Sequence, residues 1–252
     1  MDKSINNLFF ILENAFKMKL NCFTIIFLFT IGCLITVCKN QNSKTITQNV
    51  VTPDSDTNRS VLINPLTEIK IGDQTWDAAN LQLTHFKNGD FILHAITPAE
   101  WEKAGVEKKP AWCYYQNDST NNSKYGKLYN WYAVNEKRGL APSGWHVSSD
   151  TEWRKLINYI GGEAFAGSKI KCKKGWNDKG NGTNITGFTA LPGGYRFKTG
   201  GFNAEGYFGS WWTSTENLTN SAWFYSLRYD DDGIYRNNYG KEDGYAVRCI
   251  KN

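Results

Sequence analysis

The most apolar stretch of the chain spans residues 23–37 (FTIIFLFTIGCLITV). Lys17 and Lys19 precede this stretch, and the polar run KNQNSK follows it. A membrane-spanning helix needs about 20 apolar residues, whereas the apolar core of a secretory signal peptide needs roughly 7 to 15 behind a positively charged segment. The pattern therefore predicts an export signal. Translation from Met1 and translation from Met18 both fit it, since Met18 would give a shorter charged segment (MKLN).

Cys38 follows the apolar stretch directly, at the point where the chain turns polar. Its position resembles that of the lipid-modified cysteine in bacterial lipoprotein signals, although Val37 is larger than the residue that usually precedes it. Cys33 follows the small Gly32 but lies inside the apolar stretch. We therefore expect lipidation at Cys38, with the membrane contacted through that lipid. The alternative is an uncleaved signal anchor.

Residues 39–60 form a contrasting polar segment. Asn, Gln, Ser, Thr and Asp dominate it, with almost no large apolar side chain. Such a composition cannot bury enough surface to fold, which predicts a flexible tether. The chain is thus divided into a signal region at 1–38, a tether at 39–60 and one folded domain at 61–252, in which no internal repeat or Gly- or Pro-rich linker occurs.

Helical periodicity is clearest at residues 149–159. Ser149 and Glu152 have the spacing of a capping box, in which each side chain hydrogen-bonds to the backbone of the other residue. The apolar residues that share one helical face are Trp153, Leu156, Ile157 and Ile160. A shorter helix is predicted after Thr97, with Pro98 in its first turn.

The C-terminal third alternates in a way that is typical of strands. Strands are predicted at residues 187–191, 209–213, 222–229, 234–238 and 245–250. In the third of these, Trp223, Tyr225 and Leu227 share one face, and Phe224 and Ser226 share the other. Helices followed by consecutive strands predict an α+β domain that has one or two main helices and a loop-rich antiparallel sheet.

The composition agrees with a folded domain that is rich in aromatic residues. Hydrophobic residues make up 40% of the chain, aromatic residues 15% and charged residues 21%. Lys and Arg number 29 against 24 Asp and Glu, which gives a net charge of +5. Because the positive charges are spread along the chain without a basic run, we expect no nucleic-acid partner.

Eight blocks of the sequence occur in an order that resembles a known family. They are 71–76 (IGDQTW), 80–81 (NL), 125–133 (YGKLYNWYA), 139–147 (GLAPSGWHV), 152–153 (EW), 187–196 (GFTALPGGYR), 211–216 (WWTSTE) and 247–249 (VRC). Together they resemble the Fibrobacter succinogenes major paralogous domain, a family of exported bacterial lipoprotein modules. The resemblance implies a cell-envelope location and a C-type-lectin-like fold, similar also to formylglycine-generating enzymes, without an established activity.

The folded domain contains three cysteines, and Ala141 stands where some relatives of the family have another. An oxidising envelope would allow one disulfide among the three and leave one thiol. We expect the disulfide between Cys113 and Cys249, because Cys249 shares a predicted strand face with the core residue Val247 and Cys113 lies in an aromatic block. Cys172 is surrounded by lysines, which predicts an exposed thiol.

The acidic run 230–233 (DDDG) has the composition of a calcium-binding loop. An EF-hand loop counted from its first residue would place Ile234 and Lys241 at ligand positions, where oxygen ligands are needed. The favoured interpretation is a hairpin turn in which Asp232 and Gly233 supply positive φ angles. Calcium binding stays as the alternative.

Other chemistry has little support in the sequence. His85, His94 and His146 lack the spacing of a zinc site, and His146 is expected to be a hydrogen-bonded structural residue. A nucleophile elbow and a phosphate-binding loop are also missing from the sequence. We therefore predict no catalytic residue, cofactor or metal, and enzymatic function is the least favoured interpretation.

Trp211 and Trp212 are the predicted ligand-binding residues. Neighbouring side chains on a strand face opposite ways, so only one of the two can enter the same core, and the other can form a flat platform. Tryptophan faces suit both sugar rings and peptides, although a place in the core is the simpler interpretation for any single tryptophan. We expect the ligand to be a glycan or an envelope protein. The alternative function is a scaffold or interaction module without a small-ligand pocket.

Overall fold

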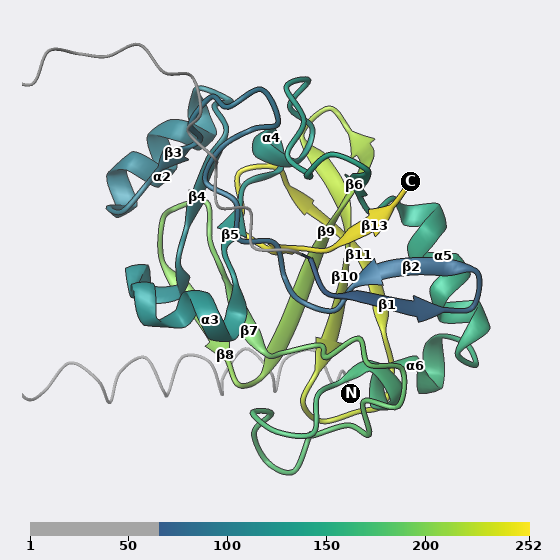
Figure 1. The fold of residues 1–252 in the computed structure, drawn as a ribbon. Helices are drawn as coiled ribbons and strands as arrows, with labels where there is room; N and C mark the ends of the chain where they lie inside the picture. Colours follow the sequence, from purple (N-terminus) through teal and green to yellow (C-terminus); the bar gives the residue numbers. More distant parts are fainter. Residues whose placement is uncertain (1–65) are drawn as a thin grey trace, which may run out of the picture. The chain divides into compact units, whose positions relative to one another are not determined.

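Residues 66–252 are the part of the chain that the computed structural model describes (Figure 1). The predicted signal region at 1–38, with Cys38, and the predicted tether at 39–60 lie outside the described residues. Helices together with mostly antiparallel sheets confirm the predicted α+β class. No helix within residues 66–252 combines the length and the apolar character that crossing a membrane requires.

The described residues belong to one compact unit that contains short helices and three sheets. The helices are α2 (Pro98–Val106), α3 (Asn122–Tyr125), α4 (Trp131–Val134), α5 (Asp150–Tyr159) and α6 (Glu163–Ile170), with 3-10 turns η1 (Tyr115–Asn117) and η2 (Ser119–Asn121). The strands are β1 (Glu68–Ile71), β2 (Gln74–Asp77), β3 (Leu93–His94), β4 (Ala111–Cys113), β5 (Leu128–Tyr129), β6 (Trp145–Val147), β7 (Gly193–Arg196), β8 (Phe202–Glu205), β9 (Phe208–Leu218), β10 (Ser221–Arg228), β11 (Tyr235–Gly240), β12 (Ala246–Val247) and β13 (Cys249–Lys251). The sheet orders are β1-β2-β13-β6, β11-β10-β9-β7-β8 and β3-β4-β5, with β12 beside β9.

Helix α5 forms where its capping box predicts it. The Ser149 hydroxyl accepts a hydrogen bond from the Glu152 amide at 3.3 Å, and the Glu152 carboxylate accepts one from the Ser149 amide at 2.7 Å. The apolar face of α5, including Trp153, is buried in the core. Helix α2 has the same kind of box, formed by Thr97 and Glu100. Both predicted helices are confirmed, whereas α6 begins without a side-chain cap and has no such local signal.

The largest sheet separates two hydrophobic cores, which explains the positions of the adjacent tryptophans. Across the β9–β10 pair, Trp211 lies opposite Tyr225 and Trp212 lies opposite Phe224. Trp211 packs in the core that includes Trp153 of α5, and Trp212 packs in a second core. Both side chains are 0% exposed. The prediction that one of them forms an exposed platform is therefore wrong, because each face of the strand has its own core.

Most of the predicted strands are present. Strands β9, β10 and β11 match the predictions at 209–213, 222–229 and 234–238, and β12 with β13 matches 245–250. The β7–β9 and β12–β9 pairs are parallel, so the large sheet is mixed rather than purely antiparallel. Residues 187–191 are a loop, contrary to the prediction. Positive φ angles of 75° at Gly187 and 54° at Thr189 bend the chain there.

Arg248 joins distant parts of the chain at the break between β12 and β13. Its side chain is fully buried. The guanidinium donates hydrogen bonds to Asn80 Oδ1 at 2.7 Å, to the carbonyls of Asp77 and Phe188 at 2.8 Å, and to the carbonyl of Thr189 at 3.1 Å. The Trp211 ring N–H donates to the same Asn80 oxygen at 2.8 Å. Burial lowers the pKa of Arg248 to about 9, so the side chain stays charged at neutral pH.

The predicted disulfide between Cys113 and Cys249 does not form. Cys113, Cys172 and Cys249 are all buried free thiols. Cys113 lies on β4 and Cys249 on β13, and the two side chains pack in different core clusters, which accounts for the error. Burial raises the pKa of the Cys113 thiol to about 12. Cys172 was predicted to be exposed but is buried in a third core cluster, the one that contains Trp153 of α5.

The acidic run at 230–233 lies in the β10–β11 hairpin, as predicted, but its turn geometry differs. Neither Asp232 nor Gly233 has a positive φ angle. Instead, the Asp231 carboxylate accepts a hydrogen bond from the Gly233 amide at 2.7 Å, and Asp230 pairs with Arg228 at 2.9 Å. In the described part of the chain, no group of three or more His, Cys, Asp or Glu side chains is placed to hold a metal ion.

Candidate functional site

An aromatic groove with a volume of about 460 Å³ lies beside the largest sheet. Its lining residues are six aromatic ones (Tyr195, Phe197, Phe208, Phe224, Tyr239 and Tyr245) and four uncharged polar ones (Ser210, Ser226, Asn237 and Asn238). This volume lies within the range of about 300 to 1,000 Å³ that is common for small-ligand pockets. An apolar lining with a few polar groups is also typical of such pockets. We define these ten residues as the aromatic groove.

Strand periodicity brings most of the lining onto one face of the sheet. Side chains two positions apart point the same way, as in the pairs Phe208 and Ser210 of β9, Phe224 and Ser226 of β10, and Asn237 and Tyr239 of β11. The register then sets Ser226 opposite Ser210 and Phe224 opposite Asn237. The groove therefore depends on the pairing of three strands.

The aromatic rings of the groove pack against one another. Phe224 and Tyr245 stack with ring centres 4.5 Å apart, and Tyr195 meets Tyr245 edge to face at 6.0 Å. Trp212 lies behind this wall, 4.5 Å from the Tyr245 ring, and its ring N–H donates to the Tyr129 carbonyl at 2.9 Å. Trp212 thus supports the groove without lining it.

The polar groups of the groove are neutral and can both donate and accept hydrogen bonds. The Asn237 amide donates to the Ser226 hydroxyl at 3.1 Å, which orients both side chains. Burial raises the pKa of Tyr195 and of Tyr245, so both phenols stay protonated at neutral pH. Tyr239 is 55% exposed and places an aromatic ring at the opening.

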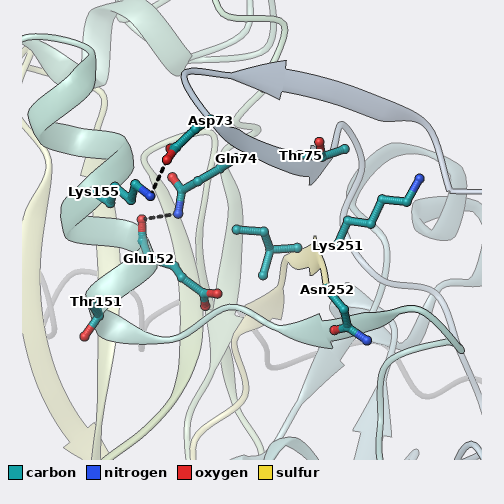
Figure 2. A pocket seen from close by; sticks show the side chains of 9 residues that line it. Asp73, Gln74, Thr75, Thr151, Glu152, Lys155, Lys251 and Asn252 are labelled. Carbon is teal, nitrogen blue, oxygen red and sulfur yellow. Dashed lines mark hydrogen bonds and ion pairs between the residues drawn. The ribbon is translucent and has the colours of Figure 1, made fainter.

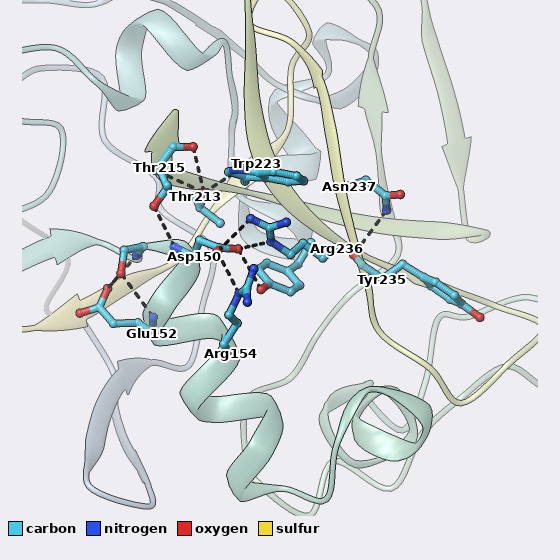
Figure 3. Close-up of polar contacts among 11 residues, drawn as sticks. Asp150, Glu152, Arg154, Thr213, Thr215, Trp223, Tyr235, Arg236 and Asn237 are labelled. Carbon is cyan, nitrogen blue, oxygen red and sulfur yellow. Dashed lines mark hydrogen bonds and ion pairs between the residues drawn. The ribbon is translucent and has the colours of Figure 1, made fainter. Parts of the chain in front are cut away.

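A charged network holds the opposite face of the same strands (Figure 3). Asp150, at the start of α5, accepts hydrogen bonds from Arg236 Nε at 2.6 Å, from Arg236 Nη2 at 3.0 Å and from the Tyr225 hydroxyl at 3.0 Å. Arg154 approaches the same carboxylate at 3.0 Å, and the Arg236 guanidinium stacks 3.2 Å from the Trp223 ring centre. The network ties α5 to β10 and β11 and so fixes the strands that carry the groove.

A second pocket of about 440 Å³ lies between the β1–β2 hairpin, α5 and the C-terminal strand (Figure 2). Its charged groups already have partners. Lys155 pairs with Asp73 at 2.5 Å, and the Glu152 carboxylate accepts from the Ser149 amide at 2.7 Å and contacts His146 Nε2 at 2.7 Å. Because these groups are satisfied within the protein, this polar pocket is the weaker candidate for a ligand site.

His146 has the role that the sequence predicts. Its two ring nitrogens contact Glu152 and Asn252, each at 2.7 Å. Neither His85 nor His94 lies in the aromatic groove. The groove residues themselves are absent from the predicted ligand set, which contains only Trp211 and Trp212. One feature of the sequence could have pointed to the groove. Phe224 and Ser226 lie on the same face of β10, so this face combines an aromatic and a polar side chain.

Comparison with known proteins assigns the family. The model of the Fibrobacter succinogenes major domain matches residues 69–251, which are 183 of the 252 residues. No curated protein and no solved structure matches the chain significantly. The match spans every helix and strand described above except the first residue of β1, and it includes all ten residues of the aromatic groove. The chain therefore belongs to the Fibrobacter succinogenes major domain family.

Proposed function

We propose that the protein is a lipid-anchored component of the cell envelope whose C-type-lectin-like domain binds a glycan in the aromatic groove. The observation that carries this proposal is the lining of the groove, where six aromatic side chains meet four uncharged polar ones. The proposal includes no reaction. Its C-type-lectin-like fold and its envelope location rest on the family resemblance and on the predicted export signal.

The chemistry of the lining suits a sugar ring. Aromatic faces pack against the apolar C–H faces of sugars, and they offer a large contact area with few rotatable bonds. Tyr239 supplies such a face at the opening, because its side chain is more than half exposed. Ser226 and Asn237 place a hydroxyl and an amide between the rings, where sugar hydroxyls need partners. Such a combination gives orientation as well as affinity.

Loss of the Tyr239 ring is expected to weaken glycan binding. We predict that Tyr239→Ala binds its best glycan roughly tenfold more weakly than the wild type, because a stacking contact is lost. The measurement is a glycan array with the full chain in detergent, followed by titration of the hits. Tyr235→Ala is the matched control, since Tyr235 is an exposed tyrosine of β11 outside the groove. Equal binding by the two variants would count against the groove.

The proposed lipid anchor has its own test. Cys38→Ser removes the predicted lipidation site, and the variant is expected to leave the membrane fraction and to lack the mass of the lipid. Cell fractionation with intact-mass measurement checks both points. Cys33→Ser is the control, because it changes a neighbouring cysteine within the apolar stretch. Continued membrane partitioning of Cys38→Ser at unchanged mass would contradict the proposal.

An interaction module without a small-ligand pocket is the second candidate, and one surface feature favours it. Phe91, Leu93 and Ile96 are exposed apolar residues on β3 and its flanks. Strand β3 lies at the edge of its sheet. Edge strands with apolar side chains are common sites of protein association. Two results together would favour this second function. The wild type would capture a protein partner that Phe91→Ser fails to capture, and no glycan on the array would bind.

A further inference from the structure

We propose that the aromatic groove selects uncharged glycans and rejects acidic ones, through a neutral lining and the buried carboxylate of Asp243 beside it. The inference rests on the proposed function, because it names the chemical class of the ligand in the same groove. The composition of the lining and the position of Asp243 in the fold each contribute to this selectivity.

The lining offers no counter-ion to an acidic ligand. Charged residues make up 21% of the chain, yet none of the ten groove residues is charged. Arg236, the one cationic residue of β11, lies on the opposite face of the strand, where it pairs with Asp150 at 2.6 Å. Moving a carboxylate from water into a site without a cation is strongly unfavourable. A neutral sugar does not have this cost, because its hydroxyls can pair with tyrosine, serine and asparagine.

Asp243 joins the two chain segments that flank the groove. It is 1% exposed, and its Oδ1 accepts a hydrogen bond from the Lys198 amide at 2.7 Å. Its own amide donates to the Gly240 carbonyl at 3.1 Å. Lys198 and Gly240 directly follow the groove residues Phe197 and Tyr239. The second oxygen, Oδ2, has no hydrogen-bond partner among the residues that the structure describes.

The carboxylate of Asp243 is ionised at neutral pH and acts on the groove wall. Burial, with a smaller contribution from the charge of Glu242, raises its pKa to about 6, although the hydrogen bond from the Lys198 amide and the charge of Lys198 oppose the rise. At pH 7.5 the group is therefore mostly negative. Burial raises the pKa values of Tyr195 and Tyr245, and the nearby charge of Asp243 raises them further. Because Asp243 Oδ1 lies 2.7 Å from the amide of Lys198, which directly follows the groove residue Phe197, the negative charge lies beside the groove wall, where it would repel an anion.

Together, the two features produce specificity by exclusion. An acidic sugar would lose its hydration, would find no cation in the groove and would lie near a buried negative charge. The corresponding neutral sugar would meet only the aromatic faces and the neutral polar groups. The difference between the two ligands is electrostatic, so it should respond to removal of the Asp243 charge.

The test compares matched pairs of glycans on the full chain in detergent at pH 7.5. Each pair consists of a hexose oligosaccharide and its counterpart with the C6 hydroxymethyl group oxidised to a carboxylate. We expect the neutral member to bind roughly tenfold more tightly or better. Equal or tighter binding of the acidic member would overturn the inference but leave the groove as a glycan site. Binding of neither member would overturn the proposed function and this inference with it.

Asp243→Asn tests the part played by the carboxylate. The substitution keeps an oxygen for the Lys198 amide and removes only the charge. The preference for the neutral member is expected to fall to roughly threefold or less, through tighter binding of the acidic member. Asp230→Asn, which removes an exposed carboxylate outside the groove, should keep the full preference. If a folded Asp243→Asn variant kept the full preference for the neutral glycan, the role assigned to Asp243 would be wrong. The comparison of neutral and acidic glycans on the wild-type protein does not depend on either variant.

Discussion

Replacing Arg248 with Met is expected to lower the free energy of unfolding by about 4 kcal/mol or more. Methionine keeps much of the buried volume but makes none of the four hydrogen bonds. The carbonyls of Asp77, Phe188 and Thr189 and the side-chain oxygen of Asn80 would lose a charged donor in the interior. Urea unfolding followed by tryptophan fluorescence measures the change, because the Trp211 ring N–H hydrogen-bonds to the same Asn80 oxygen.

Arg228→Met is the matched control for this experiment. Arg228 is also an arginine of the folded domain, but it is exposed, and within residues 66–252 its guanidinium pairs with Asp230 alone. Exposed ion pairs contribute about 0 to 1 kcal/mol, so this variant should unfold close to the wild type. If Arg248→Met and Arg228→Met unfolded at the same urea concentration, the described role of Arg248 would be wrong.

Replacing Asp150 with Ala is expected to lower the free energy of unfolding by roughly 3 kcal/mol. The substitution leaves the Arg236 guanidinium without its carboxylate and removes the acceptor of the buried Tyr225 hydroxyl. The link between α5 and the β10–β11 pair would be lost with it. Arg154→Ala is the control, because it removes an exposed partner of the same carboxylate and should cost less than about 1 kcal/mol. Equal losses in the two variants would contradict this account.

The contribution of Asp150 to the free energy of unfolding should also depend on pH. Burial alone would raise the pKa of Asp150, but hydrogen bonds from Arg236 and Tyr225 outweigh it and hold the pKa below its ordinary value. A carboxylate with a lowered pKa stabilises the fold above its ordinary pKa of about 3.9 and loses that contribution as the pH falls. The difference between the wild type and Asp150→Ala should therefore shrink below about pH 4. A difference that stays constant down to pH 2 would exclude this contribution.

Local signals made the main helices predictable. The capping boxes at Ser149 and Thr97 involve residues three positions apart, so the sequence contains the whole interaction. Strand periodicity likewise located both ends of β10 and β11 to within two residues, but the strand predicted at 209–213 ends five residues before β9 does. The pairing of strands is different, because it joins residues that are far apart. The parallel contact between β7 and β9 and the loop at Gly187 follow from such long-range packing and were not predictable locally.

The candidate site was harder to predict than the fold. The alternation of side chains along a strand correctly predicted that Trp211 and Trp212 lie on opposite faces of β9. It could not show that each of these faces is covered by a hydrophobic core. The groove needs Tyr195, Phe224 and Tyr245 from three separate segments, and no spacing along the chain brings them together. The same limit explains the wrong disulfide, since Cys113 and Cys249 share a buried character but not a core cluster. The alternation along a strand shows which side chains share a face, whereas the burial of each face and the contacts between distant residues depend on long-range packing.

The most direct test of the central claim is to map where a glycan binds. The tightest neutral oligosaccharide from the array is titrated into the isotope-labelled full chain, and backbone amide chemical shifts are followed by NMR. The account predicts that the largest shifts occur at Ser226, Asn237 and Tyr239, around the aromatic groove. The largest shifts at Asp73 and Lys155, which line the polar pocket, would contradict it.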